Sequence, residues 1–156
     1  MQLSTHLSLA EFIVSDNAKR HGIDNTPTPE HLENAKILAN KIFEPIRLKF
    51  GKPIYLSSGY RSKLLNGVTK GASKTSEHCT AEAMDLDQDG RGNHITNKEV
   101  FDYIKDNLEF NQLIWEFGTD KNPDWVHASY SANGKQKKQI LKAIRVNGKP
   151  KYIPYV

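Results

Sequence analysis

The sequence predicts a single α+β domain spanning residues 1–156, in which a small antiparallel sheet packs on N-terminal helices. Helical patterns come mainly first and strand patterns last, which is typical of segregated helices and strands rather than of a doubly wound fold. The 156 residues, of which 37% are hydrophobic, suit one core of ordinary domain size. The single cysteine, Cys79, excludes an intramolecular disulfide framework, so this core must stabilise the fold without crosslinks.

The N-terminal part of the sequence carries two helical patterns. A capping-box pattern begins at Ser8 and a typical helix stop stands at Gly22, so we expect one short helix between them. A longer core helix begins at Pro29, is kinked by Pro45 and ends before Gly51. The apolar residues that recur at helical spacing along it are Leu32, Ala35, Leu38, Ala39, Ile42 and Phe43.

The remaining elements are a third helix and a series of strands. Thr96 and Glu99 form a second capping box, which opens a helix with an apolar face. A loop rich in glycine, serine, threonine and lysine covers residues 66–77 and is long enough to be functional. The strand patterns cover residues 54–57, 83–86, 113–117, 125–130, 140–146 and 152–155.

The composition limits the classes of partner. A net charge of +4 and an isoelectric point near 9.1 favour anionic partners. No recognition motif for nucleic acid accompanies this charge, so no nucleic-acid partner is expected. No apolar run approaches the roughly 20 residues that span a bilayer, and residues 1–6 lack the pattern of a secretory signal peptide. We expect a monomer that is made in the cytoplasm and does not insert into a membrane.

Three residues form a candidate metal site: His78, Asp85 and His127. Two histidines and one carboxylate are a common ligand set of catalytic zinc, because three protein ligands leave one tetrahedral position open. His78 lies in the polar loop and Asp85 in the following strand, so the chain can double back and direct both at one ion. The helical motif H-E-x-x-H is absent.

The residues around these ligands resemble a known family of enzymes. The pattern S-x-H-x-x-G-x-A-x-D falls on residues 76–85, a Trp-x-His strand on residues 125–127, and an S-G-Y-R-S segment on residues 58–62. These motifs are similar to those of the zinc D-alanyl-D-alanine carboxypeptidases, the D-Ala-D-Ala dipeptidases and the phage L-alanyl-D-glutamate endolysins. The compact phage and prophage branch is the most similar. The resemblance implies a Hedgehog/DD-peptidase-like zinc peptidase fold.

The resemblance also implies an activity and further site residues. We expect a zinc metallopeptidase that hydrolyses a bond in the stem peptides of bacterial peptidoglycan, as a carboxypeptidase or an endopeptidase. Arg61 would bind the oxyanion that develops during the reaction, and Tyr60, Ser76 and Trp125 would contact the substrate. A phage or prophage endolysin of this kind reaches the cell wall from the cytoplasm through a holin-type pore.

Two carboxylates compete for the role of general base. Glu116 belongs to the strand before His127, and a hairpin would bring it beside that ligand. Asp124 lies three residues before His127, as in the endolysin-type D-x-x-H arrangement, but in a regular strand it would face away. Strand alternation therefore favours Glu116, and Asp124 remains the alternative.

One position departs from the family pattern, because Ala81 stands where the family has glycine. If this position needs a positive φ, alanine strains the backbone by about 1 kcal/mol. The departure keeps an alternative function open, namely a catalytically weak zinc-binding module of the same fold that binds cell-wall peptides or a protein partner. The bond that is cleaved also stays open, because the loops around a pocket decide it.

Overall fold

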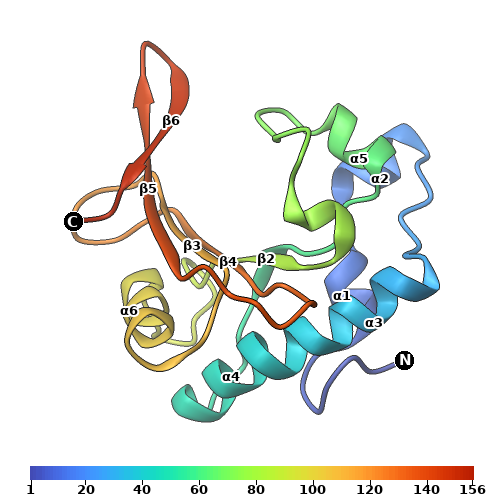
Figure 1. The fold of residues 1–156 in the computed structure, drawn as a ribbon, viewed down its shortest axis with the longest axis horizontal. Helices are drawn as coiled ribbons and strands as arrows, with labels where there is room; N and C mark the ends of the chain where they lie inside the picture. The colour runs from blue at the N-terminus through green and yellow to red at the C-terminus, as the bar shows by residue number, and fades with distance from the viewer.

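A six-stranded sheet forms the centre of the computed structural model, which describes residues 1–156 (Figure 1). The strands lie in the spatial order β1-β2-β4-β3-β5-β6. Neighbouring strands are antiparallel, except that β3 and β5 run parallel. The strands are β1 (Leu56–Ser58), β2 (Ala83–Leu86), β3 (Gln112–Glu116), β4 (Trp125–Ser129), β5 (Gln139–Val146) and β6 (Lys149–Pro154). The protein is therefore an α+β fold, as predicted, with a mixed sheet.

The parallel pair β3–β5 is the one departure from the antiparallel sheet expected from the sequence. After β4 the chain cannot return beside that strand, because β2 and β3 already pair with both of its edges. Residues 130–138 instead carry the chain past β3, where β5 adds to the free edge. The final hairpin β5–β6 then extends beyond the rest of the sheet (red in Figure 1).

Side-chain alternation gives the sheet one apolar and one polar face, because successive residues of a strand point to opposite sides. The apolar face belongs to the main core and carries Met84, Leu86, Leu113, Trp115, Val126 and Ala128. The opposite face borders a cavity and carries Asp85, Gln112, Ile114, Glu116, Trp125 and His127. The same alternation that buries the core thus gathers the polar residues on one side.

Helices cover the apolar face. One of them is α6 (Asn97–Asn107), which contacts β3 and β4 and places Phe101 edge-on against Trp115, with ring centroids 5.2 Å apart. The long N-terminal helix contributes Leu38, Ile42 and Ile46 to the same core. The remaining helical segments are α1 (Leu9–Ile13), α2 (Asp16–His21), α3 (Pro29–Leu38), the π turn η1 (Ala39–Phe43), α4 (Glu44–Phe50), α5 (Lys63–Val68) and the 3-10 helix η2 (Glu77–Thr80).

One helical prediction needs correction, and the structure adds a detail to a second. The single helix expected between Ser8 and Gly22 is two helices, because Val14 is extended and the Ser15 side chain caps a new helix by accepting from the Ala18 amide. In the long helix, the π turn η1 ends at Phe43, two residues before Pro45. A proline lacks the amide hydrogen that an α-helix needs, and the wider π turn accommodates this change.

The two outer strands of the sheet are both irregular. β1 is three residues long and its register against β2 shifts between Leu56 and Ser58. β6 contains Pro150 and Pro154, which have no amide hydrogen to donate. None of the helices is both long enough and apolar enough to span a bilayer.

Candidate metal centre

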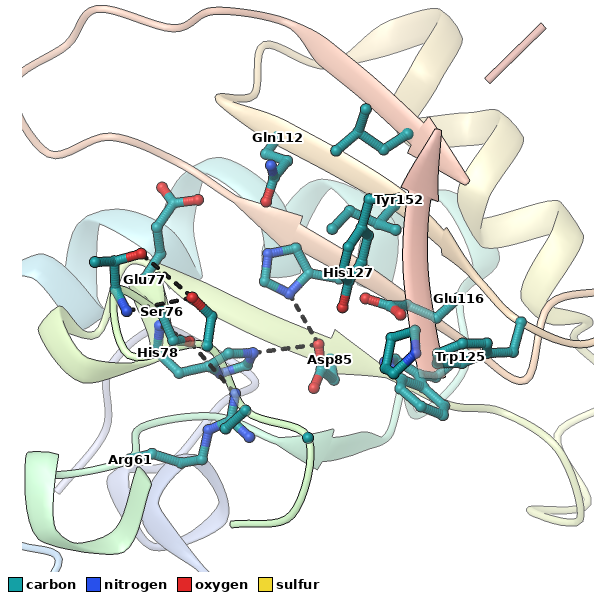
Figure 2. A pocket seen from close by; sticks show the side chains of 18 of the residues that line it. Arg61, Ser76, Glu77, His78, Asp85, Gln112, Glu116, Trp125, His127 and Tyr152 are labelled. Carbon is teal, nitrogen blue, oxygen red and sulfur yellow. Dashed lines mark hydrogen bonds and ion pairs between the residues drawn. The ribbon is translucent and has the colours of Figure 1, made fainter. Parts of the chain in front are cut away.

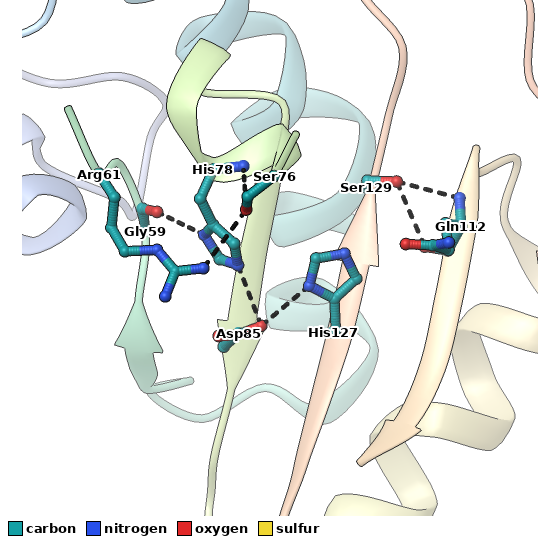
Figure 3. Close-up of polar contacts among 8 residues, drawn as sticks. All are labelled: Gly59, Arg61, Ser76, His78, Asp85, Gln112, His127 and Ser129. Atoms are coloured by element: carbon teal, nitrogen blue, oxygen red, sulfur yellow. Dashed lines mark hydrogen bonds and ion pairs between the residues drawn. The ribbon is translucent and has the colours of Figure 1, made fainter. Parts of the chain in front are cut away.

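Three potential metal ligands converge on the polar face of the sheet (Figure 3). Asp85 Oδ1 lies 3.3 Å from His78 Nε2 and 3.1 Å from His127 Nδ1. One ligand atom from each residue lies within 4.8 Å of the other two. Both histidines are buried, and 13% of the Asp85 side chain is exposed. The structure thus brings together the three residues that the sequence indicates as ligands.

His78 is oriented by hydrogen bonds to neighbouring residues. It lies in η2, where the N-cap Ser76 hydroxyl accepts from the His78 amide at 3.2 Å. The ring atom Nδ1 lies 2.6 Å from the carbonyl oxygen of Gly59, to which it donates (Figure 3). This bond fixes the orientation of the ring and directs Nε2 at Asp85.

Gly59 has no room for a side chain at this point. A Cβ atom would lie 2.2 Å from the carbonyl oxygen of Phe12 in α1, a backbone atom that cannot move aside easily. The next amide, that of Tyr60, donates to the same Phe12 oxygen at 2.9 Å. Close packing of α1 on this segment therefore places the carbonyl that holds His78.

The turn between η2 and β2 has a left-handed residue, Ala81, with φ 62° and ψ 31°. The Ala81 amide bonds to the carbonyls of Glu77 and His78, which ends η2 and sends the chain back into β2. Ala81 is fully buried, so its methyl group contributes to the core. The positive φ that the sequence analysis considered is present, with a strain of about 1 kcal/mol, and the ligands still converge.

Asp85 and His127 are direct cross-strand partners in the β2–β4 ladder. Facing residues of an antiparallel pair have Cβ atoms only about 4.5–5.5 Å apart on the same face of the sheet. A contact between residues 42 positions apart in the sequence therefore follows from strand register.

The electrostatics of the cluster favour positive charge. Burial alone would raise the pKa of the Asp85 carboxyl, but the charge and hydrogen bonds of His78 and His127 lower it well below the ordinary value. Burial would lower the pKa of His127, but Asp85, with smaller effects of Glu116 and Glu77, raises it. Removing protons from the histidines thus leaves a net negative site, which a cation would neutralise.

The spacing of these atoms fits a zinc ion. Zinc bonds to histidine nitrogen and carboxylate oxygen are about 2.0–2.1 Å long, so two ligands of a tetrahedral ion are about 3.3 Å apart. The separations from Asp85 Oδ1, 3.3 Å and 3.1 Å, agree with this value. In addition, His127 Nε2 and Glu116 Oε2 are buried without a hydrogen-bond partner, which indicates that polar groups of a ligand complete the site.

Arg61 reaches the cavity from the segment after β1. Its amide donates to the carbonyl of His78 at 3.1 Å, and its guanidinium donates to the hydroxyl of Ser76 at 3.4 Å. Arg61 Nε is buried without a partner, and no carboxylate lies within ion-pair distance. The guanidinium charge therefore remains available to a bound molecule.

The two candidate bases differ in position. Glu116 lines the cavity and is 5% exposed, two residues along β3 from Ile114, the cross-strand partner of His127. Asp124 is exposed and does not line the cavity. Burial, followed by the negative charge of Asp85, raises the pKa of Glu116 to about 7, against smaller effects of His127 and Arg61. The position of Glu116 in the cavity favours it over Asp124 as the general base.

Two of the three residues expected to contact the substrate line the cavity: Ser76 and Trp125 (Figure 2). Tyr60 does not, because its side chain is 4% exposed and packs in the core, where its hydroxyl lies 3.0 Å from His31 Nδ1. The Tyr60 amide also donates to the carbonyl of Phe12 in α1, which holds this residue against the helices. The structure therefore gives Tyr60 a packing role in place of the expected contact.

A cavity of about 540 Å³ surrounds the cluster. The loop at residues 70–76 forms one wall and the β5–β6 hairpin another, with Tyr152 beside His127 and Glu116 (Figure 2). The sequence analysis did not identify the hairpin residues Leu141, Arg145 and Tyr152. The sequence pattern of the hairpin predicts two strands, but it does not predict that β5 pairs with β3 and so borders the cavity.

The sequence matches the profile of one protein family. The profile of the family described as Peptidase M15 matches residues 5–129, which include the three candidate metal ligands, Arg61 and Glu116. No curated protein matches the chain. The matched segment ends with β4, so the β5–β6 hairpin lies outside it.

Proposed function

The chain belongs to the peptidase M15 family, and from this premise we propose that it is a zinc peptidase that hydrolyses a bond in the stem peptides of bacterial peptidoglycan. The convergence of His78, Asp85 and His127 at zinc spacing carries the proposal. These residues would hold the ion at the floor of a cavity large enough for a short peptide. Ala81 does not displace the ligands, which favours an enzyme over the catalytically weak module.

Glu116 acts as the general base in this proposal. His78, Asp85 and His127 would hold a zinc ion, which would supply a Lewis acid for the peptide carbonyl and for water. Glu116 Oε2, which is buried and has no hydrogen-bond partner, accepts the proton of the attacking water. The same carboxyl then returns the proton to the leaving amine. A carboxyl with a pKa near neutral pH suits both directions of transfer.

Arg61 stabilises the negative charge that develops on the carbonyl oxygen. Its guanidinium is held by the Ser76 hydroxyl and has no carboxylate partner, so it keeps donors for an oxyanion. Ser76 therefore acts by orienting Arg61 and capping η2, in addition to lining the cavity.

The substrate class rests on the motifs in residues 58–62, 76–85 and 125–127, which resemble those of enzymes that cleave D-Ala-D-Ala or L-Ala-D-Glu bonds. The positive net charge suits the anionic polymers of a bacterial envelope. We place the protein with phage or prophage endolysins on the same resemblance.

Mass spectrometry of muropeptides tests the proposal. Purified peptidoglycan is incubated with zinc-loaded wild-type protein, with Glu116→Gln and with Asp124→Asn as the matched control. We expect the wild type and Asp124→Asn to shorten the stem peptides and Glu116→Gln to leave them nearly intact, and the new termini identify the bond. Unchanged muropeptides after treatment with a wild-type protein that holds one zinc would refute the assignment.

A further inference from the structure

The β5–β6 hairpin brings a strong positive charge to the cavity. Residues 131–156 contain seven lysines and arginines and no aspartate or glutamate, whereas residues 1–130 contain 15 cations and 18 carboxylates. The positive net charge of the chain therefore arises from this segment. Of its seven cations, Arg145 is the one that lines the cavity.

Phe117 connects this hairpin to the candidate metal centre. It follows Glu116 directly, and a regular strand would direct the two side chains to opposite faces, yet both line the cavity. The reason is a left-handed backbone at Phe117, with φ 57°. Such a conformation is unfavourable for a residue with a side chain and is typical of functional sites. Here it turns an aromatic ring to the polar side of the sheet.

The Phe117 ring supports Arg145. The Arg145 guanidinium carbon lies 4.0 Å from the centre of that ring, whose other neighbour is Trp125, with ring centroids 5.5 Å apart. Arg145 takes part in none of the ion pairs of the protein. A guanidinium held against an aromatic ring keeps its N–H edge free for the two oxygens of a carboxylate.

The other charges that line the cavity explain why the Arg145 guanidinium is important for binding an anionic peptide. Three carboxylates, Glu77, Asp85 and Glu116, line the cavity and would repel an anionic peptide, whereas the other lining cations, Arg61 and Lys70, do not belong to the hairpin. A cation on the opposite wall offsets this repulsion and gives the negative group of the ligand a defined position. The hairpin thus supplies a contact that the matched residues 5–129 do not contain.

We propose that Arg145, supported by Phe117, binds a carboxylate of the substrate peptide and selects anionic peptides. The inference rests on the proposed peptidase function and specifies which substrates it accepts. The carboxylate has two possible sources, the C-terminus of the peptide or the side chain of an acidic residue within it. The first source would suit a carboxypeptidase and the second an endopeptidase.

Binding measurements separate these sources without relying on turnover. The protein is zinc-loaded Glu116→Gln, with or without Arg145→Gln, and its affinities are measured by isothermal titration calorimetry at pH 7. The probe is the pentapeptide L-Ala-γ-D-Glu-L-Lys-D-Ala-D-Ala, used with both carboxylates free, with either one converted to an amide, and with both converted. Lys149→Gln is the matched control, because it removes one charge from the same hairpin at a residue that does not line the cavity.

We expect Arg145→Gln to weaken binding of the unmodified peptide roughly tenfold, as for loss of a charged hydrogen bond. The peptide whose critical carboxylate is already an amide should bind equally to both proteins, and this identifies the source. Lys149→Gln should change each affinity less than twofold, and Arg145→Lys should give an intermediate loss because it keeps the charge without the planar fork.

Equal affinities of the Arg145→Gln and parent proteins for every peptide would overturn the proposal, as would an equal loss for the doubly amidated peptide. Arg145-dependent binding with no cleavage of muropeptides by the wild type would count against the proposed peptidase function alone. Cleavage by the wild type with binding that is independent of Arg145 would count against this inference alone.

Discussion

Replacing Glu116 by glutamine should change how the stability of the zinc-free protein depends on pH. In the unfolded chain this carboxyl has the ordinary pKa of 4.5, and in the folded protein burial and Asp85 raise the value to about 7. Below pH 4.5 the carboxyl is protonated in both states and does not affect the equilibrium. Between these pKa values the unfolded state releases its proton first, so stability falls as pH rises.

The size of the effect follows from the two pKa values. One pKa unit corresponds to about 1.4 kcal/mol, so the wild type should lose roughly 3 kcal/mol relative to Glu116→Gln between pH 4.5 and pH 8. The other titrating groups are present in both proteins, and His127, whose pKa the Glu116 charge raises, is coupled to the substitution.

Urea unfolding in the presence of a chelator, followed by tryptophan fluorescence at several pH values, measures this difference. The free energies of unfolding of the two proteins should be closest near pH 4.5 and diverge as pH rises. Added zinc should reduce the divergence, because a divalent cation nearby lowers the pKa of Glu116. Parallel curves without zinc would show that Glu116 ionises as in water, and the argument from its burial would fail.

Three further predictions concern the metal, Arg61 and the turn after β3. The protein should bind one zinc per chain by elemental analysis and gain about 3 kcal/mol of stability at a hundredfold excess over the dissociation constant, whereas His78→Ala should show neither effect. Arg61→Ala should keep its zinc and its melting temperature but lose about 10²–10³-fold in turnover. A lower melting temperature with unchanged turnover would indicate that Arg61 has a structural role. Gly118→Ala should lower the free energy of unfolding by at least about 2 kcal/mol in urea titrations, because Gly118 has φ 71° and a Cβ would lie 2.3 Å from the Asn122 carbonyl oxygen. Wild-type stability of that variant would mean that the turn rearranges freely.

The residues of the candidate metal centre could be named from the sequence because they stand in short, recognisable patterns at residues 76–85 and 125–127. Two histidines and an aspartate are typical ligands of catalytic zinc. Strand alternation determines which side chains share a face of the sheet, and Asp85 and His127 share one. The same alternation predicts that Glu116, and not Asp124, faces the side of the sheet that carries His127. The α+β class followed from the order of helical and strand patterns.

The parts that could not be predicted depend on register between distant strands or on single backbone angles. The parallel placement of β5 beside β3 depends on which edge of the sheet is free, and this placement brings Arg145 to the cavity. A φ of 57° at Phe117 reverses the side expected for that residue. Tyr60 was expected to contact the substrate from the resemblance of residues 58–62, but its side chain is buried in the core.

The irregular outer strands bear on how the protein behaves at high concentration. An open sheet exposes unpaired amides and carbonyls at its two edges, and another copy could add there as an extra strand. β1 is too short and too bulged to act as a template, while the prolines of β6 remove donors and Lys149 and Lys151 place charge on that strand. Substituting valine for Pro150 and Lys151 would remove these protections from β6, so we expect the double variant to form aggregates that light scattering detects at concentrations where the wild type stays dispersed.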